Sequence, residues 1–327
     1  MRACRRCAVQ AVALGVCLAM AAALGGCGSR ADLTMKMNPG DRFEVATDSD
    51  VSTATEMMGM SQSDSQRTGE TMLFEVKSVD AEGWATIEAT IQRLETPALE
   101  GLGPLAEGLN IEEALSLEGR TFTLTMSPKG KVSSVTGMDR VAAEAGDALV
   151  TAVKDVMGKQ MEQLPEAMRG MEQLLTGELD VAVRKGVRDQ LGDEAIRERF
   201  ESMFAVYPED PTVTKGAVWE RTLSLFKGQP MVLNDTFTLE EVKDGVARIA
   251  VASQVSPNTA AEPMSVMGME MKLELSGSRT GTIEIDTGTG WITSCTMESE
   301  MDGDMLIMGM QGTMKVTGTE RVVVTRL

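Results

Sequence analysis

The chain contains no histidine among its 327 residues. Histidine is the commonest general base at neutral pH and a frequent ligand of zinc and copper(II), so its absence removes the usual centre of hydrolytic and metal chemistry. The sequence also has no phosphate-binding glycine loop, no nucleophile elbow and no zinc-ligand spacing. We therefore expect a protein that is not an enzyme and that holds no cofactor.

Cysteine is scarce, and four of the five cysteines lie within the first 27 residues. Cys4, Cys7 and Cys17 belong to an N-terminal segment that we expect to be removed. Cys295 is then the only cysteine besides Cys27, so no disulfide within the chain is expected. We interpret Cys295 as a small buried apolar residue rather than a nucleophile.

The N-terminal segment has the pattern of a bacterial lipoprotein signal. A positive stretch at residues 2–6 precedes an apolar run at 8–23. That run is shorter than the roughly 20 apolar residues a spanning helix needs, so we exclude residues 1–26 from the fold. The four residues that follow resemble a lipobox: Leu24, Gly25, Gly26 and Cys27. The resemblance implies that the Cys27 thiol is diacylated, the chain is cut before it, and its new amine is acylated.

The lipobox predicts a lipid-anchored protein of the bacterial cell envelope. Gly28, the residue after Cys27, is not aspartate, which favours the outer membrane over the inner one by analogy with enteric bacteria. Removing residues 1–26 takes away three arginines and no acid, so the net charge falls from −18 to −21. Such an acidic chain repels nucleic acid and gains nothing from an anionic membrane surface. The acyl chains must therefore provide the membrane attachment.

The rest of the sequence predicts a short tether at 27–32 and a single α+β domain at 33–327. Residues 33–136 and 208–327 show the apolar–polar alternation of antiparallel strands with one buried face. Residues 137–207 lie between them and show the spacing of amphipathic helices. The economical packing is one or two curved antiparallel sheets around the central helical segment.

We interpret the two β-rich parts as divergent copies of one unit. Three landmarks recur in the same order: a glycine before a strand-opening aromatic, a hairpin turn, and an Arg-Thr-x-Thr strand that leads to another turn. These are Gly40 and Gly216, the turns at Gly83 and Gly245, and the strands beginning at Arg120 and Arg279. The alternative is a set of generic antiparallel hairpins that share turn chemistry.

Methionine is abundant at 26 residues, and Met-Gly-Met occurs three times. In a strand, residues two apart point to one face, so each motif would place two thioethers side by side. Such side chains fill irregular interiors, line a pocket for an apolar ligand, or bind soft Cu(I) or Ag(I). The candidate residues are Met58, Met60, Met267, Met269, Met271, Met308 and Met310.

Two acidic motifs are interpreted as turns. Residues 286–288, Asp-Thr-Gly, resemble the aspartic-protease signature, but that chemistry needs a second carboxylate, and the matching turn at 127–130 has no acid. Asp302 and Asp304 have the spacing of a calcium loop but lack its other ligands. We therefore predict a hairpin tip at Asp302 and Asp304.

The chain resembles a family of uncharacterised bacterial lipoproteins, a domain of unknown function. The resemblance rests on the strand openers at Gly40 and Gly216 and on residues 79–87, 192–208 and 275–291. It implies no activity and no site residues. The layout is also similar in outline to curved-sheet carriers and lipoproteins of the LolA and mycobacterial lipid-binding type, a likeness of fold alone.

From these observations we expect a non-catalytic envelope lipoprotein that binds an apolar or lipid ligand. One alternative is a structural or interaction module that meets an envelope protein partner through a sheet edge or its acidic surface. Another is a methionine-based Cu(I) or Ag(I) binder. Whether the space between sheet and helices is filled or hollow separates the first two hypotheses.

Overall fold

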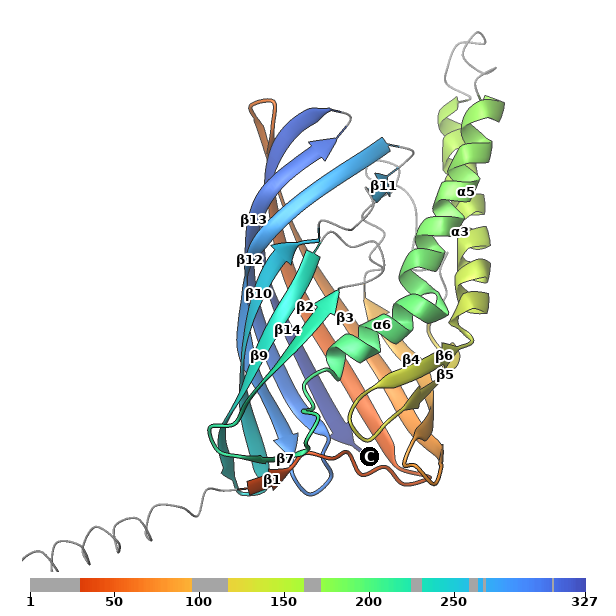
Figure 1. The fold of residues 1–327 in the computed structure, drawn as a ribbon. Coiled ribbons are helices and arrows are strands. Elements are labelled where there is room, and N and C mark those ends of the chain that lie inside the picture. Colours follow the sequence, from red (N-terminus) through yellow and green to blue (C-terminus); the bar gives the residue numbers. More distant parts are fainter. Residues whose placement is uncertain are drawn as a thin grey trace, which may run out of the picture.

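The protein is built around one large curved antiparallel sheet with helices on one side (Figure 1). This is the α+β class that the sequence predicted. The computed structural model describes residues 30–95, 117–161, 172–224, 231–258, 264–266, 269–307 and 309–327. The predicted signal segment and Cys27 lie outside the described residues.

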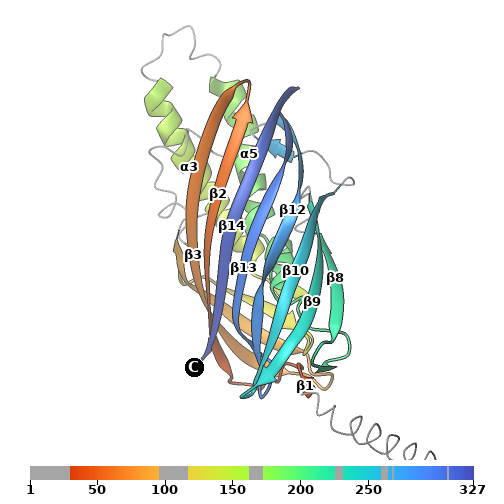
Figure 2. The same cartoon turned by 90° about the vertical axis from the view of Figure 1, so that its left-hand side faces the viewer.

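The large sheet joins its strands in the order β6-β5-β4-β3-β2-β14-β13-β12-β10-β9-β8, with β11 paired to β12. The path leaves β6 and β8 as its edge strands, and the sheet is not closed. Figure 2 shows β3, β2, β14, β13, β12, β10, β9 and β8 side by side in this order. The strands are β2 (Arg42–Met57), β3 (Met60–Val79), β4 (Ala85–Glu95), β5 (Thr121–Met126), β6 (Val132–Thr136), β8 (Val218–Ser224), β9 (Met231–Lys243), β10 (Val246–Pro257), β11 (Met264–Val266), β12 (Met269–Asp286), β13 (Ile292–Ile307) and β14 (Met310–Arg326).

One end of the sheet holds both ends of the described chain. There β1 (Arg30–Asp32) pairs with β7 (Thr212–Thr214), and the C-terminus lies beside them (Figure 1). We call this the near end. The opposite end, where the β2–β3 and β13–β14 hairpins turn, is the far end.

In the described residues, three helices accompany the sheet: α3 (Met138–Met161), α5 (Glu172–Leu191) and α6 (Asp193–Met203). α6 packs on one face of the sheet in its near half, and we call this the inner face; the opposite face is the outer face. α3 and α5 pack against each other and rise beside β4, β5 and β6 (Figure 1). In the described part of the chain, no helix has the length and apolar character needed to cross a membrane.

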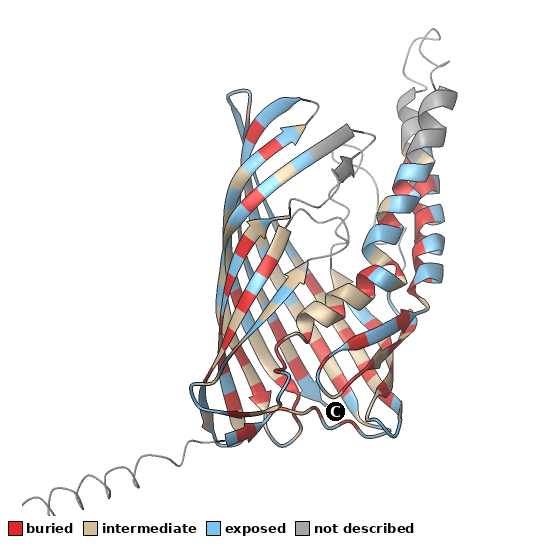
Figure 3. Cartoon of the chain, in the orientation of Figure 1, coloured by how far each residue is buried: buried red, intermediate tan, exposed pale blue. Residues whose placement is uncertain are grey.

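The near half of the interior is a buried core of aliphatic side chains with a cluster of aromatic rings at the contact between α6 and the sheet. Phe200 of α6 contacts Phe74 and Phe122 on the sheet, with ring centroids 5.4 and 5.9 Å apart. Trp291 stacks on Phe43 at 4.0 Å. Every one of these rings except that of Trp291 comes from an apolar position of an alternating strand or of the amphipathic helix, as the periodicity predicted. The near half is thus a solid core (Figure 3).

The predicted repeat is visible in the topology. The backbone N–H of Gly40 donates to Val76 at 2.8 Å, and the N–H of Gly216 donates to Leu239 at 2.8 Å. These bonds fix the start of β2 against β3 and the start of β8 against β9. Each unit then continues as a meander, β2 to β6 and β8 to β13, with the two meanders in tandem across the sheet. β14 joins them centrally.

Helices α3 and α6 cap each other. The Asp193 carboxylate accepts hydrogen bonds from the backbone N–H groups of Met138 and Asp139, at 2.7 and 3.1 Å. The Asp139 carboxylate accepts from the N–H of Asp193 at 3.2 Å. Each aspartate thereby satisfies donors that a helix start leaves unpaired. Asp193 lies in the first turn of α6, and the N-cap of α6 is Gly192. The Asp193 side chain therefore caps the start of α3 rather than the start of its own helix.

We predict that Asp193→Ala lowers the free energy of unfolding by about 1–2 kcal/mol, since two backbone donors lose their acceptor. The measurement is chemical denaturation followed by circular dichroism. Asp189→Ala is the matched control, because Asp189 forms only an exposed ion pair with Lys185, four residues away on α5. The control is expected to change stability by less than about 0.5 kcal/mol. Equal losses in both variants would contradict the capping role.

Candidate functional site on the inner face of the sheet

Beyond the aromatic core, the inner face continues toward the far end as an apolar surface. Strand pairing places its residues in successive rows across β9, β10, β12, β13, β14 and β2. The rows, counted from the core outward, are Leu233, Val255, Gly277, Met301 and Val316; then Leu275, Gly303 and Met314; then Leu273, Met305, Gly312 and Met57. On β2, the first two rows end in the polar residues Thr53 and Thr55, which lie opposite Val316 and Met314. Leu275 and Met305 are buried, while Met301 and Met314 are partly exposed. We call this set the far apolar face.

Glycine is required at two places on the far apolar face. A Cβ at Gly303 would lie 1.9 Å from the carbonyl oxygen of Glu274 on β12. A Cβ at Gly277 would lie 2.1 Å from the carbonyl oxygen of Glu300 on β13. A side chain at either position would collide with the neighbouring strand, so bare backbone alternates with flexible methionine side chains on this surface.

A polar belt separates the far apolar face from the aromatic core. Its members project from the inner face of six strands and are Glu70, Glu320, Arg279, Ser253, Asp235 and Arg221. Asp235 and Ser253 are opposite each other on β9 and β10, and Arg279 is opposite Ser253 on β12. The belt thus places charges where the rest of the inner face is apolar.

Three arginines at the belt have partners. Arg199 of α6 pairs with Glu70. Burial by itself would lower the pKa of Arg199, but the attraction of Glu70 outweighs it, and the pKa is raised. Arg279 pairs with Glu320 at 3.1 Å. Arg221 turns toward the near end and donates to the Tyr207 carbonyl oxygen at 2.9 Å.

Asp235 and Ser253 are the exception in the polar belt. They are 6% and 5% exposed, and the Asp235 Oδ1 and Ser253 Oγ atoms are buried without a hydrogen-bond partner. A buried acceptor left unpaired costs about 1–3 kcal/mol, and more when it is charged. Native folds seldom keep such a pair without a reason. This pair marks the base of the far apolar face.

The sequence held a signal for these residues that motif reasoning missed. Asp235 stands between Leu233 and Phe237, at the inward position of an alternating strand. Ser253 interrupts Val251 and Val255 in the same way. A polar residue at an inward position of an amphipathic strand is the signal, because the alternation otherwise predicts an apolar side chain there.

The Met58-Gly59-Met60 motif forms a hairpin tip rather than a strand interior, so the prediction of two thioethers side by side on one strand face is wrong for Met58 and Met60. Met57 pairs with Met60, and Met58 and Gly59 form the two-residue turn with φ of 54° and 77°. Asparagine or aspartate with glycine is the usual turn of this kind, and glycine supplies the left-handed conformation at the second position. The motif therefore terminates the hairpin.

The candidate methionines that the structure describes lie at the far end of the sheet. Ile307 of β13 pairs with Met310 of β14 on one side and with Met271 of β12 on the other. In the sheet order, β2, which ends at the β2–β3 tip, is the next strand after β14. Met58, Met60 and Met310 are 72%, 70% and 37% exposed. Met267 and Met308 lie outside the described residues, as do the side chains of Met269 and Met271. Among the described residues, no three histidine, cysteine, aspartate or glutamate side chains are placed to hold a metal ion.

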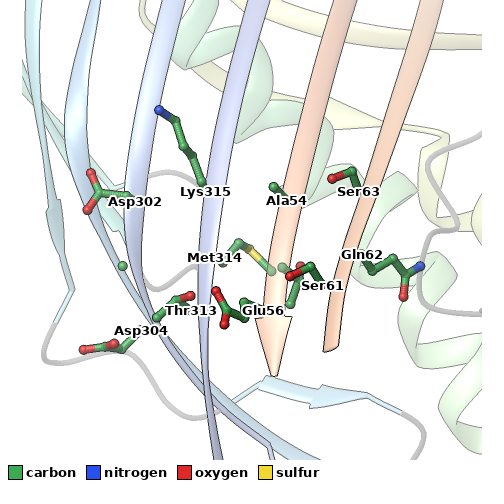
Figure 4. Close-up of a pocket in the computed structure, with 12 residues that line it drawn as sticks. Ala54, Glu56, Ser61, Gln62, Ser63, Asp302, Asp304, Thr313, Met314 and Lys315 are labelled. Atoms are coloured by element: carbon green, nitrogen blue, oxygen red, sulfur yellow. The ribbon is translucent and has the colours of Figure 1, made fainter. Parts of the chain in front are cut away.

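The outer face carries a polar pocket of about 440 Å³ near the far end (Figure 4). Three carboxylates and one ammonium project into it: Glu56, Asp302, Asp304 and Lys315. Asp302 and Asp304 lie within β13, so the prediction of a hairpin tip there is wrong. The charges make this pocket unsuited to an apolar ligand.

Two other sequence candidates have structural roles. The Asp286 carboxylate accepts from the Thr289 N–H at 2.7 Å and stabilises the β12–β13 turn, as predicted. Cys295 is largely buried on β13. Burial, with a smaller contribution from Glu320, raises the pKa of its thiol to about 11. The thiolate is the nucleophilic form of cysteine, so Cys295 has little of it at neutral pH.

Comparisons with known proteins give a family but no activity. The profile of a family of unknown function (DUF6263) matches residues 113–292, more than half of the chain. No curated protein matches the sequence. The outer membrane protein OprG from Pseudomonas aeruginosa aligns over 90% of this chain and 99% of its own, with 8% identity and a TM-score of 0.22. An outer membrane channel from Pseudomonas putida F1 aligns over 89% and 98%, with 8% identity and a TM-score of 0.21. These scores are too low to support any inference from either structure.

Proposed function

The chain belongs to the DUF6263 family, which has no known function, and we propose from its own geometry that it is a non-catalytic lipoprotein of the bacterial cell envelope that holds an apolar or lipid ligand. The observation that carries the proposal is the far apolar face. Its ligand would lie against the inner face of β12, β13, β14 and β2, beyond the aromatic core.

The dimensions of this surface suit an acyl chain. From Val316 in the first row to Met310 at the rim, β14 runs six residues, or about 20 Å at ~3.3 Å per residue. One leaflet of a bilayer has a hydrocarbon thickness of about 15 Å, half of the ~30 Å core. An acyl chain of membrane length therefore fits along the strands. Partly exposed Met301 and Met314 offer adaptable apolar contacts to it.

The lipid anchor that we propose at Cys27 sets the orientation. Three peptide units separate Cys27 from Arg30 at the near end, a reach of at most about 11 Å. The near end would then face the membrane, and the far end would stand off by about 55 Å, the length of 17-residue β14. In this arrangement, the exposed methionines Met58 and Met60 form the outermost rim of the far apolar face.

Site-specific photocrosslinking in cells tests the proposal with the full chain. A benzophenone amino acid in place of Met301 is expected to form adducts with membrane lipids, because residue 301 is part of the far apolar face. The matched control is the same probe at Asp302, which faces the outer side of the same strand and is exposed. Mass spectrometry of the crosslinked peptide is expected to show at least about tenfold more lipid adduct at position 301 than at position 302. A tenfold ratio corresponds to a binding free energy that favours position 301 by ~1.4 kcal/mol.

Two outcomes would overturn the proposal. Equal lipid labelling at both positions would indicate nonspecific contact with the membrane. Adducts to a protein at position 301, without lipid, would instead support the interaction-module alternative.

A further inference from the structure

We propose that Asp235 and Ser253 bind the polar head of an amphiphile whose apolar part lies on the far apolar face, and that this head carries hydrogen-bond donors, as an ammonium or a hydroxyl group does. The inference rests on the proposed function and names the chemical class of its ligand.

The two side chains are placed where such a head would lie. Asp235 and Ser253 are opposite each other on β9 and β10. Leu233 and Val255, two residues farther along the same strands, are opposite each other in the first row of the far apolar face. Inward side chains in adjacent rows are neighbours on one face of the sheet. An amphiphile with its apolar part along the rows therefore brings its head to Asp235 and Ser253.

The neighbouring cations do not satisfy the Asp235 carboxylate. Arg221 is its cross-strand neighbour on β8, but the guanidinium donates to the Tyr207 carbonyl oxygen and lies 3.7 Å from Glu209. Arg279, one strand beyond Ser253, pairs with Glu320 on the side away from β9. The Asp235 Oδ1 atom is left unpaired although two arginines lie on neighbouring positions of the belt.

The missing partner must be a donor. An ionised carboxylate only accepts hydrogen bonds, and a serine hydroxyl both donates and accepts. Directly opposite side chains have Cβ atoms about 4.5–5.5 Å apart, so one donor-bearing group between them reaches both oxygens. A head with acceptor oxygens alone would leave Asp235 unpaired and add like charge. Ammonium and hydroxyl heads therefore fit, and purely anionic heads do not.

The test uses the benzophenone probe at Met301 in the full chain and reads the head group of each lipid adduct by mass spectrometry. Most adducts are expected to carry an ammonium or hydroxyl head. Asp235→Asn removes the charge but keeps an acceptor oxygen, and Asp235→Leu removes both. If the head is an ammonium, both variants lower its share of adducts about tenfold or more. If the head is a hydroxyl, only Asp235→Leu does so.

The control is Asp302→Asn on the outer face, which is expected to leave the head-group distribution unchanged. Circular dichroism and thermal melting show whether each variant folds. Unchanged head groups in a folded Asp235→Leu variant would overturn the inference, as would wild-type adducts dominated by acceptor-only heads; in both cases, a buried water between Asp235 and Ser253 would be the better account. If the chain with the probe at position 301 and no other substitution formed no lipid adducts, the proposed function itself would be rejected.

Discussion

Replacing Cys27 by serine is expected to abolish acylation of the chain and remove its stable attachment to the membrane, while the described domain keeps its fold. Attachment by acyl chains is worth about 0.8 kcal/mol for each buried CH₂ group. The acidic domain offers no electrostatic substitute, and the part of the chain that the structure describes holds no spanning helix. Incorporation of labelled palmitate should fall to background, and fractionation should show the protein displaced from its normal membrane.

Cys295→Ser is the control for this experiment. Cys295 lies on β13 within the folded domain and is the only other cysteine that remains once residues 1–26 are removed. The control variant should be acylated and attached like the wild type. Normal processing and full membrane attachment of the Cys27→Ser variant would show that the lipobox interpretation is wrong.

Truncating Phe200 to alanine is expected to cost about 3–5 kcal/mol of unfolding free energy, the typical loss for a buried aromatic side chain. Phe200 is 1% exposed and contacts Phe74, Phe122 and Phe204, with ring centroids 5.4, 5.9 and 6.4 Å apart. It joins α6 to Phe74 on β3 and Phe122 on β5. Its removal leaves a cavity that several packed rings must border, and the loss is measurable by chemical denaturation of the full chain.

Met58→Ala is the control for Phe200→Ala. It removes a large apolar side chain that is exposed, so it shows how much stability is lost when no core packing is disturbed. Met58 is 72% exposed at the β2–β3 tip, so its truncation is expected to change stability by less than about 0.5 kcal/mol. If Phe200→Ala were as mild as Met58→Ala, the aromatic core would not be what holds α6 on the sheet.

Much of the fold could be predicted from local patterns. Alternation in strands such as β4 and helical spacing around Phe200 report which face of an element is buried, because each period is a property of the local backbone. Turn glycines such as Gly40 and Gly216 showed the repeat, since the same left-handed turn geometry recurs in both units.

The errors have a physical cause as well. The sequence predicts a strand interior at Met58-Gly59-Met60 and a hairpin tip at Asp302, whereas the structure has a hairpin tip at the first and a strand interior at the second. Glycine serves both in turns and at close approaches within strands, so either interpretation fits the local sequence. Gly59 has a left-handed φ of 77° at a tip, whereas Gly303 lies within β13 against the Glu274 carbonyl oxygen. Only the pairing register distinguishes these two uses of glycine.

The amino-acid sequence by itself determined the α+β class, the two β units around a helical segment, and the lipobox that predicts the anchor. All three depend on residues close together in the chain. The tertiary structure alone decided that the two units join into one curved sheet through β14, that its near half is solid, and that Asp235 and Ser253 meet, unpaired, at the base of an apolar surface. These features depend on contacts between strands far apart in sequence, and hydrophobic periodicity carries no information about which strands become neighbours.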